Sequence, residues 1–246
     1  MLERSYIDFN ELFLKLPTEI LQYPNEMIKY RVANQFYIDP ILIEVKKPDI
    51  DIDFSFIGYK PMKIKQLLTN YVDLDSWEEY KERIENSRSL SLTFYFNQRK
   101  KIKGSNQDAS PCILNFILSR KNRSEKFDEM FIYYRTVDLG RTIYLDMVLF
   151  NQMIKDLGDL VDLKSIRFFI PYGFLHVANI QFFLKLHPME LDEKNEFTKN
   201  VIRRKERLLR KVDFKYKSEK RIKKFLTGEL ALKPISSIDL FKGEEK

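Results

Sequence analysis

The chain has 246 residues, of which 44% are hydrophobic and 14% aromatic, and its formal net charge is +7. This composition excludes a chain that is disordered throughout, because it can supply a full core in one large domain or two small ones. The basic excess lies in residues 199–225, which hold 13 basic and 3 acidic residues. The rest of the chain is slightly acidic, so a surface coated in positive charge for nucleic acid is not expected.

The cysteine and histidine content limits the possible metal and redox chemistry. A single cysteine, Cys112, excludes an internal disulfide framework and a multi-cysteine zinc site. Two histidines, His176 and His187, are too few for most other metal sites. The N-terminus lacks the apolar core of a signal peptide, and no stretch approaches the ~18 apolar residues of a membrane span. Common glycine-rich phosphate loops are also absent from the sequence. We therefore expect a soluble, cytoplasmic protein with no metal and no membrane partner.

The first part of the chain predicts helices on either side of a strand pair. Residues 1–30 place apolar side chains at helical spacing until Pro17 interrupts the pattern. Residues 36–56 alternate apolar and polar side chains about a turn at 46–49, which predicts two strands. Residues 62–85 return to a helical period.

The middle of the chain is rich in predicted strands. Strict alternation over 90–97 indicates a half-buried strand, and a polar loop follows over 98–110. The clearest helical pattern is 143–157. The other predicted strands are 112–119, 130–135, 166–170 and 174–184, with a charged turn at 121–128. The fold class is therefore α+β, divided into a domain of residues 1–198 and a basic, helix-like C-terminal extension of residues 199–246.

Two residues stand out because their surroundings do not explain them. Asp146 lies partly on the apolar side of its predicted helix, where a carboxylate is unfavourable unless it is paired. It either sits at the edge of the apolar stripe, favoured by the helix dipole, or is a polar group in a pocket. Cys112 opens a strand after Pro111 and is either a small buried hydrophobe or a nucleophile.

Two further positions have both an ordinary and a functional interpretation. Arg135 and Thr136 follow an apolar strand and would grip a phosphate well, but Arg135 could equally form a surface ion pair with Asp138. His176 lies among apolar residues and is either a core histidine or a ligand-binding group.

The order and spacing of these residues resemble the catalytic half of the thymidylate synthase superfamily. In chain order they are Pro111 and Cys112, then Arg135, Thr136 and Asp138, then Asp146 and His176. Asp146 follows Asp138 by eight residues and precedes His176 by thirty, and the family has matching intervals. Upstream, Ser87 and Arg88 resemble the start of the family's Ser-Arg-Arg segment. The resemblance covers about residues 60–185.

The resemblance implies a fold and a chemistry. The fold is a three-layer sandwich around a bent mixed sheet, in a symmetric homodimer that packs sheet to sheet. The thiolate of Cys112 would add to C6 of a pyrimidine nucleoside monophosphate, and 5,10-methylenetetrahydrofolate would supply a one-carbon unit to C5. Arg135 and Thr136 would hold the 5′-phosphate, and the charge of Arg135 would promote the thiolate. The remaining assignments are Arg88 from a second copy to the phosphate, His176 to the sugar and Asp138 to the folate.

Asp146 occupies the position that reads the base in this family. Thymidylate synthases carry Asn there, whereas enzymes that hydroxymethylate cytidylate carry Asp. A carboxyl group accepts from the N4 amino group of cytosine and, when protonated, donates to N3. The resemblance therefore implies C5 hydroxymethylation of a cytidylate, with methylation of deoxyuridylate as the alternative.

The chain departs from the family pattern at several positions. Gln66 stands where the family has a catalytic Glu, and Ala178 and Ile113 replace a Tyr and a His. The second Arg of the Ser-Arg-Arg segment is Ser89. The segment between Gln66 and Arg88 is short, which leaves only Trp77, Glu78 and Glu79 as substitutes for folate contacts. These departures keep open a non-catalytic homologue that binds a nucleotide. Nucleic-acid binding by residues 199–225 is a further alternative, although such a basic run is usually a solvated face.

Overall fold

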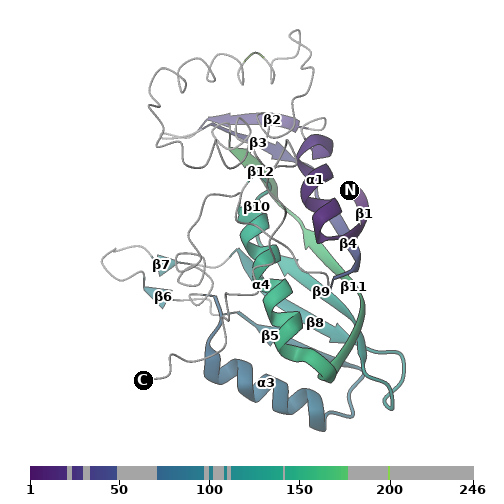
Figure 1. The fold of residues 1–246 in the computed structure, drawn as a ribbon. Helices are drawn as coiled ribbons and strands as arrows, with labels where there is room; N and C mark the ends of the chain where they lie inside the picture. Colours follow the sequence, from purple (N-terminus) through teal and green to yellow (C-terminus); the bar gives the residue numbers. More distant parts are fainter. Residues whose placement is uncertain are drawn as a thin grey trace, which may run out of the picture.

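The structure is a computed structural model that describes residues 1–20, 24–29, 34–48, 71–96, 100–101, 108–109, 112–140, 142–176 and 199. A six-stranded sheet is its centre (Figure 1). In spatial order its strands are β1 (Leu2–Asp8), β4 (Ile41–Lys47), β11 (Val161–Ile170), β9 (Phe127–Tyr134), β8 (Ile113–Ser119) and β5 (Ser91–Tyr95). The pairs β1–β4 and β11–β9 are parallel and the other pairs are antiparallel, so the sheet is mixed.

A second, four-stranded sheet follows directly on the first, because at three places the chain runs from a strand of one sheet into a strand of the other. Its order is β10 (Val137–Asp138), β12 (Gly173–His176), β3 (Asn34–Ile38) and β2 (Pro24–Lys29). The chain passes from β3 into β4 through residues 39–40, from β9 into β10 through 135–136, and from β11 into β12 through 171–172. The pairing of Ile170 with Ile41 in the large sheet gives way to that of Gly173 with Ile38 in the small one. Together the two sheets form one bent, mixed sheet.

The bend has local causes in the sequence. Pro40 and Pro171 interrupt two of the crossing strands, because proline cannot donate a ladder hydrogen bond. Gly173 begins β12, and a Cβ atom there would lie 2.7 Å from Leu139 Cδ1. A larger residue at this position would require the Leu139 side chain to move.

The helices pack on one face of the large sheet. They are α1 (Phe9–Ile20), α3 (Leu74–Asn86) and α4 (Thr142–Leu157), and the short 3₁₀ helix η2 (Gly158–Leu160) follows α4. Phe116, Ile132 and Phe168 lie opposite one another on β8, β9 and β11, so they share a face. Phe9 of α1 and Phe150 of α4 contact Phe168, with ring centroids 6.2 and 5.8 Å apart. Trp77 of α3 contacts Phe116 at 6.3 Å. This face therefore carries the core.

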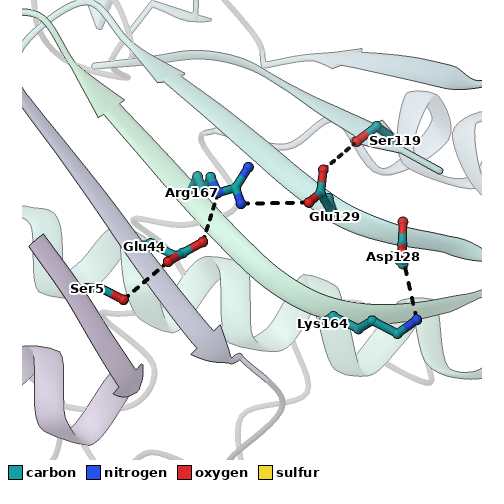
Figure 2. Close-up of polar contacts among 7 residues, drawn as sticks. All are labelled: Ser5, Glu44, Ser119, Asp128, Glu129, Lys164 and Arg167. Carbon is teal, nitrogen blue, oxygen red and sulfur yellow. Dashed lines mark hydrogen bonds and ion pairs between the residues drawn. The ribbon is translucent and has the colours of Figure 1, made fainter. Parts of the chain in front are cut away.

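The opposite face carries a row of polar side chains across five strands (Figure 2). Arg167 of β11 donates from Nε to Glu44 Oε1 of β4 at 2.9 Å, and its Nη2 lies 3.7 Å from Glu129 Oε1 of β9. Ser5 of β1 and Ser119 of β8 extend the row through these two glutamates. The row alternates in charge, so neighbouring strands attract one another.

A third, two-stranded ribbon lies within the segment predicted as a polar loop over 98–110. It consists of β6 (Lys100–Lys101) and β7 (Asp108–Ala109).

The structure mixes helices and strands as the α+β class requires, and most predicted elements that lie within the described residues are confirmed, with three corrections near the N-terminus. Residues 24–29 form the strand β2 and are not helical, because they pair with β3. Residues 2–8 form β1 and are not helical, because they pair in parallel with β4 and bury Tyr6. The helix does not end at Pro17 but continues to Ile20, because burial of Leu16 and Ile20 favours the helical path. The predicted segments 50–56, 62–70 and 177–184 lie outside the described residues, as does the basic run apart from Lys199.

Candidate functional site

The bend of the sheet brings the predicted nucleophile next to the predicted phosphate-binding arginine. Cys112 directly precedes β8, and Arg135 directly follows β9. Because β8 and β9 are antiparallel, these two strand ends meet, and Arg135 N donates to Cys112 O at 2.8 Å. The Cys112 side chain is partly buried, whereas Arg135 is exposed and Thr136 is half-buried. The backbone thus holds Cys112 and Arg135 next to each other at the ends of β8 and β9.

Asp146 lies in the second turn of α4, on the side that faces the sheet. Its exposed fraction is 1%, so it does not lie at an exposed edge of the helix. Burial raises the pKa of Asp146 to about 8, and a hydrogen-bonding interaction with the Tyr134 hydroxyl opposes this rise. The contact nevertheless falls short of a well-formed hydrogen bond. Neither Asp146 Oδ2 nor Tyr134 Oη has a hydrogen-bond partner within the described part of the chain.

The charges of three other predicted site residues affect the pKa of the Cys112 thiol. Burial, Asp146 and Asp138 together raise the pKa of Cys112 to about 11, against the opposing effect of Arg135, which lowers it. The expected effect of Arg135 on the thiolate therefore has the right sign, but burial and the carboxylates outweigh it. The net direction in the free protein favours the neutral thiol.

Two tyrosines belong to this site that sequence reasoning did not select. Tyr134 is the last residue of β9 and is fully buried, and Tyr71 lies just before α3. Burial raises the pKa of both, with contributions from Asp146 and Cys112. For Tyr134 a signal was present, since the alternation of β9 turns it to the inner face directly before Arg135.

Asp138 and His176 lie on neighbouring strands of the smaller sheet. Asp138 is 5% exposed, and its Oδ1 accepts from the backbone N–H of Gly140 at 2.9 Å. This bond shapes the turn between β10 and α4. Asp138 pairs with Phe174 in the register of β10 and β12, and His176 ends β12 opposite Gln35 of β3. The backbone of His176 is thus two residues beyond the partner of Asp138.

Arg88 is not near Cys112 within one chain. It is exposed in the segment between α3 and β5. Arg120 donates to the carbonyl oxygens of Ser87 and Ser89, which places this segment where β8 ends. Cys112 lies where β8 begins, about 24 Å away for a seven-residue strand. A contribution of Arg88 from a second copy stays a prediction.

The residues considered as substitutes for folate contacts, Trp77, Glu78 and Glu79, do not lie at the site of Cys112. Trp77 has no exposed surface, and its Nε1 donates to Asp156 Oδ2 at 2.7 Å, so it cannot stack on a ligand. Glu78 pairs with Lys81 at 2.8 Å on the outside of α3, and Glu79 is exposed. Ile113 is buried in β8. Gln66, Pro111 and Ala178 lie outside the described residues.

Comparison with known proteins gives no family. No protein-family model matches the chain, and no curated protein matches it. No helix in the described ranges is long and apolar enough to cross a membrane. The functional argument therefore depends on the residues and their geometry.

Proposed function

We propose that the protein hydroxymethylates C5 of a pyrimidine nucleoside monophosphate, a cytidylate, through a covalent adduct on Cys112. One observation carries the proposal. Arg135, Asp138 and Asp146, which the resemblance groups with Cys112, come from different parts of the chain and all lie within electrostatic reach of its thiol. Their meeting at the bend supports a common site.

The exposed guanidinium of Arg135 is suited to the 5′-phosphate. Guanidinium groups bind phosphate oxygens with two parallel hydrogen bonds, and Thr136 adds a hydroxyl next to it. Because a backbone hydrogen bond keeps Arg135 next to Cys112, a nucleotide whose phosphate binds Arg135 would have its base near the sulfur. The thiol attacks C6 after losing its proton, and C5 becomes the nucleophilic carbon.

The one-carbon unit comes from a co-substrate, for which the resemblance implies 5,10-methylenetetrahydrofolate. A C–C bond forms at C5, the C5 proton leaves, water supplies the hydroxyl group, and Cys112 departs with release of tetrahydrofolate. Asp138 is the residue that the resemblance assigns to the folate. Its engagement with Gly140 N makes it a group that shapes the turn as well.

The resemblance also implies the thymidylate synthase fold and a homodimer. The bent mixed sheet with helices on one face is what supports this part of the proposal. The polar row of Figure 2 lies on the face that does not carry the helix contacts, which is the face that would meet a second copy.

A second candidate function is a homologue that binds the nucleotide without turning it over. The high pKa of Cys112, about 11, favours this alternative, because a neutral thiol is a poor nucleophile. It predicts nucleotide binding without a covalent adduct. Methylation of deoxyuridylate remains a third possibility, distinguished by the substrate and the product.

The test uses deoxycytidylate labelled with tritium at C5, together with 5,10-methylenetetrahydrofolate. We expect tritium release by the full-length chain and none by Cys112→Ala. A parallel assay with labelled deoxyuridylate identifies the base. No release above the Cys112→Ala control with either nucleotide would exclude the enzyme. A stable adduct with a 5-fluoro nucleotide, seen by mass spectrometry, would exclude the non-catalytic alternative.

A further inference from the structure

One arginine side chain holds the short segment that joins α3 to β5. Arg120, directly after β8, donates from Nη2 to Ser87 O at 2.6 Å and from Nε to Ser89 O at 3.0 Å. Its backbone N–H donates to Leu90 O at 3.0 Å. Within the segment, Ser89 N donates to Ser87 Oγ at 3.0 Å. These four hydrogen bonds fix the backbone on both sides of Arg88.

Arg120 is itself held in place by its surroundings. Its Nη1 donates to Glu125 O at 2.9 Å, and its guanidinium carbon lies 4.4 Å from the centroid of the Phe127 ring, which is buried. A guanidinium group is planar and presents its donors in a fixed fork, so it can bind several carbonyl oxygens at once. A lysine ammonium group is a single point of charge and would not reproduce this set of contacts.

The side chain of Arg88 contrasts with the fixed backbone that carries it. It is exposed, and it forms no hydrogen bond or ion pair with the rest of the described chain. A group that binds a ligand normally loses conformational freedom, and this loss weakens binding. Because the backbone around Arg88 is already fixed, only its side chain remains to be ordered. The segment is thus preorganised to present a guanidinium group to an anion.

The segment lies at the rim of the sheet face that would meet a second copy. Arg120 directly follows Ser119, which belongs to the polar row of that face (Figure 2). Within one chain, Arg88 lies where β8 ends and Cys112 where it begins. A second copy packed on this face about a two-fold axis that crosses the strands would have its β8 reversed. Arg88 of one copy would then come close to Cys112 of the other.

We propose that Arg120 is a positioning residue for nucleotide binding between two copies: it fixes the backbone around Arg88, so that the Arg88 guanidinium of one copy binds the 5′-phosphate held by Arg135 in the other. This inference rests on the proposed function and its homodimer, and it deepens them. Arg120 acts through Arg88, because its own side-chain donors are engaged with backbone carbonyl oxygens. A phosphate monoester carries about two negative charges near neutral pH, which suits two guanidinium groups.

The first experiment measures the affinity of deoxycytidylate by calorimetry in the wild type, Arg88→Ala, Arg120→Ala and the double variant. We expect each single variant to bind about tenfold more weakly, because a charge-assisted contact to the phosphate is lost. The double variant should bind no more weakly than Arg88→Ala, because the two residues act as one unit.

Two further variants separate position from charge. Arg120→Lys keeps the positive charge but not the fork of donors, so it should bind as weakly as Arg120→Ala. The control is Arg123→Ala, which removes an exposed charge from the turn between β8 and β9 and should bind like the wild type. Circular dichroism checks that each variant folds. If Arg120→Ala does not fold, Arg120→Lys takes its place in the double variant.

Mixed dimers separate this role from a merely structural one. Chains with different substitutions are co-expressed, and tritium release is compared with the mean of the two parents. Cys112→Ala with Arg120→Ala should exceed that mean, because one site combines an intact Cys112 with an Arg88 that the other copy holds correctly. Arg88→Ala with Arg120→Ala should not exceed it, because neither copy supplies a correctly held Arg88. A defect confined to its own chain would not follow this pattern.

Several results would overturn the inference. Additive losses in the double variant would show that Arg120 acts independently of Arg88, and wild-type affinity in Arg120→Lys would show that only its charge matters. Absence of restoration with Cys112→Ala would show that Arg120 serves the site of its own chain. If the wild type neither binds deoxycytidylate nor releases tritium, the proposed function fails, and the inference fails with it. If the wild type is active and the Arg120 variants behave like it, only the inference fails.

Discussion

Asp146 shows at the scale of one residue how a buried carboxyl group can oppose folding. Its carboxyl group is completely buried, and its pKa is about 8 in the folded chain against 3.8 for an ordinary aspartate. Between these two values the folded chain holds a proton that the unfolded chain has released. The free energy of unfolding therefore falls as pH rises from about 4 to about 8, by at most about 1.4 kcal/mol per pH unit.

The substitution Asp146→Asn tests this sign. It keeps the shape and removes the titration, so we expect the variant and the wild type to be similar near pH 4. At pH 8 the variant should be more stable, by on the order of 3 kcal/mol. Urea unfolding at pH 4, 6 and 8 measures the difference. Parallel pH profiles for the two chains would show that Asp146 ionises without penalty and contradict the burial argument.

At the scale of elements, α3 is joined to α4 through one carboxylate. Asp156 accepts from Trp77 Nε1 at 2.7 Å and from Lys81 Nζ at 3.0 Å. Trp77 is fully buried among Tyr80, Phe94 and Phe116, so its N–H has no access to water. This bond fixes how α3 packs against the helix that carries Asp146.

Removing the carboxylate in Asp156→Ala should lower the free energy of unfolding by about 1–3 kcal/mol, because a buried donor is left unpaired. The matched control is Glu78→Ala, which removes only the exposed partner of Lys81 and should have an effect of about 0–1 kcal/mol. Trp77 is the only tryptophan in the chain, so its fluorescence reports the unfolding of this region directly. An equal decrease in the free energy of unfolding in the two variants would show that the hydrogen bond from Trp77 Nε1 is not the source of the stability.

At the scale of the whole molecule, the two faces of the large sheet differ in kind. One face is covered by helices and carries the core, and the other presents the polar row centred on Arg167 (Figure 2). Half-buried aromatic rings lie beside this row. Phe131, Tyr133 and Phe169 follow one another on this second face, and Arg167 stacks over Phe131 at 5.1 Å. Aromatic rings with a central arginine are typical of protein interfaces.

If a second copy packs on this face, the chain sediments as a dimer, at twice 29.7 kDa. Arg167→Glu would place three carboxylates in a row and should convert the dimer to a monomer, with a loss of affinity of at least about tenfold. The control is Lys164→Glu on the same strand, whose side chain is 71% exposed and lies 3.8 Å from Asp128. Circular dichroism checks that both variants fold. A monomeric wild type at micromolar concentration would contradict the homodimer.

The periodicity of the sequence was enough to predict most described elements, because side-chain spacing reflects burial within one element. The stripe of α4 and the alternation of β5, β8 and β9 are local properties of this kind. The strand β1 was missed, because its pairing with β4 depends on a segment more than thirty residues away. The helical path through Pro17 was missed for the same reason, since burial of Leu16 and Ile20 is a tertiary property.

For the candidate site, too, some features could be predicted from the sequence and others depend on the tertiary structure. Cys112, Arg135, Asp138 and Asp146 were selected because their types, order and intervals resemble those of a known family, and these properties can be read from the chain. The tertiary structure decided that Trp77 is buried, that Arg88 is at the far end of β8, and that Tyr134 meets Asp146. Burial and the approach of separate elements set these contacts and the pKa values that follow from them, and no local pattern encodes either.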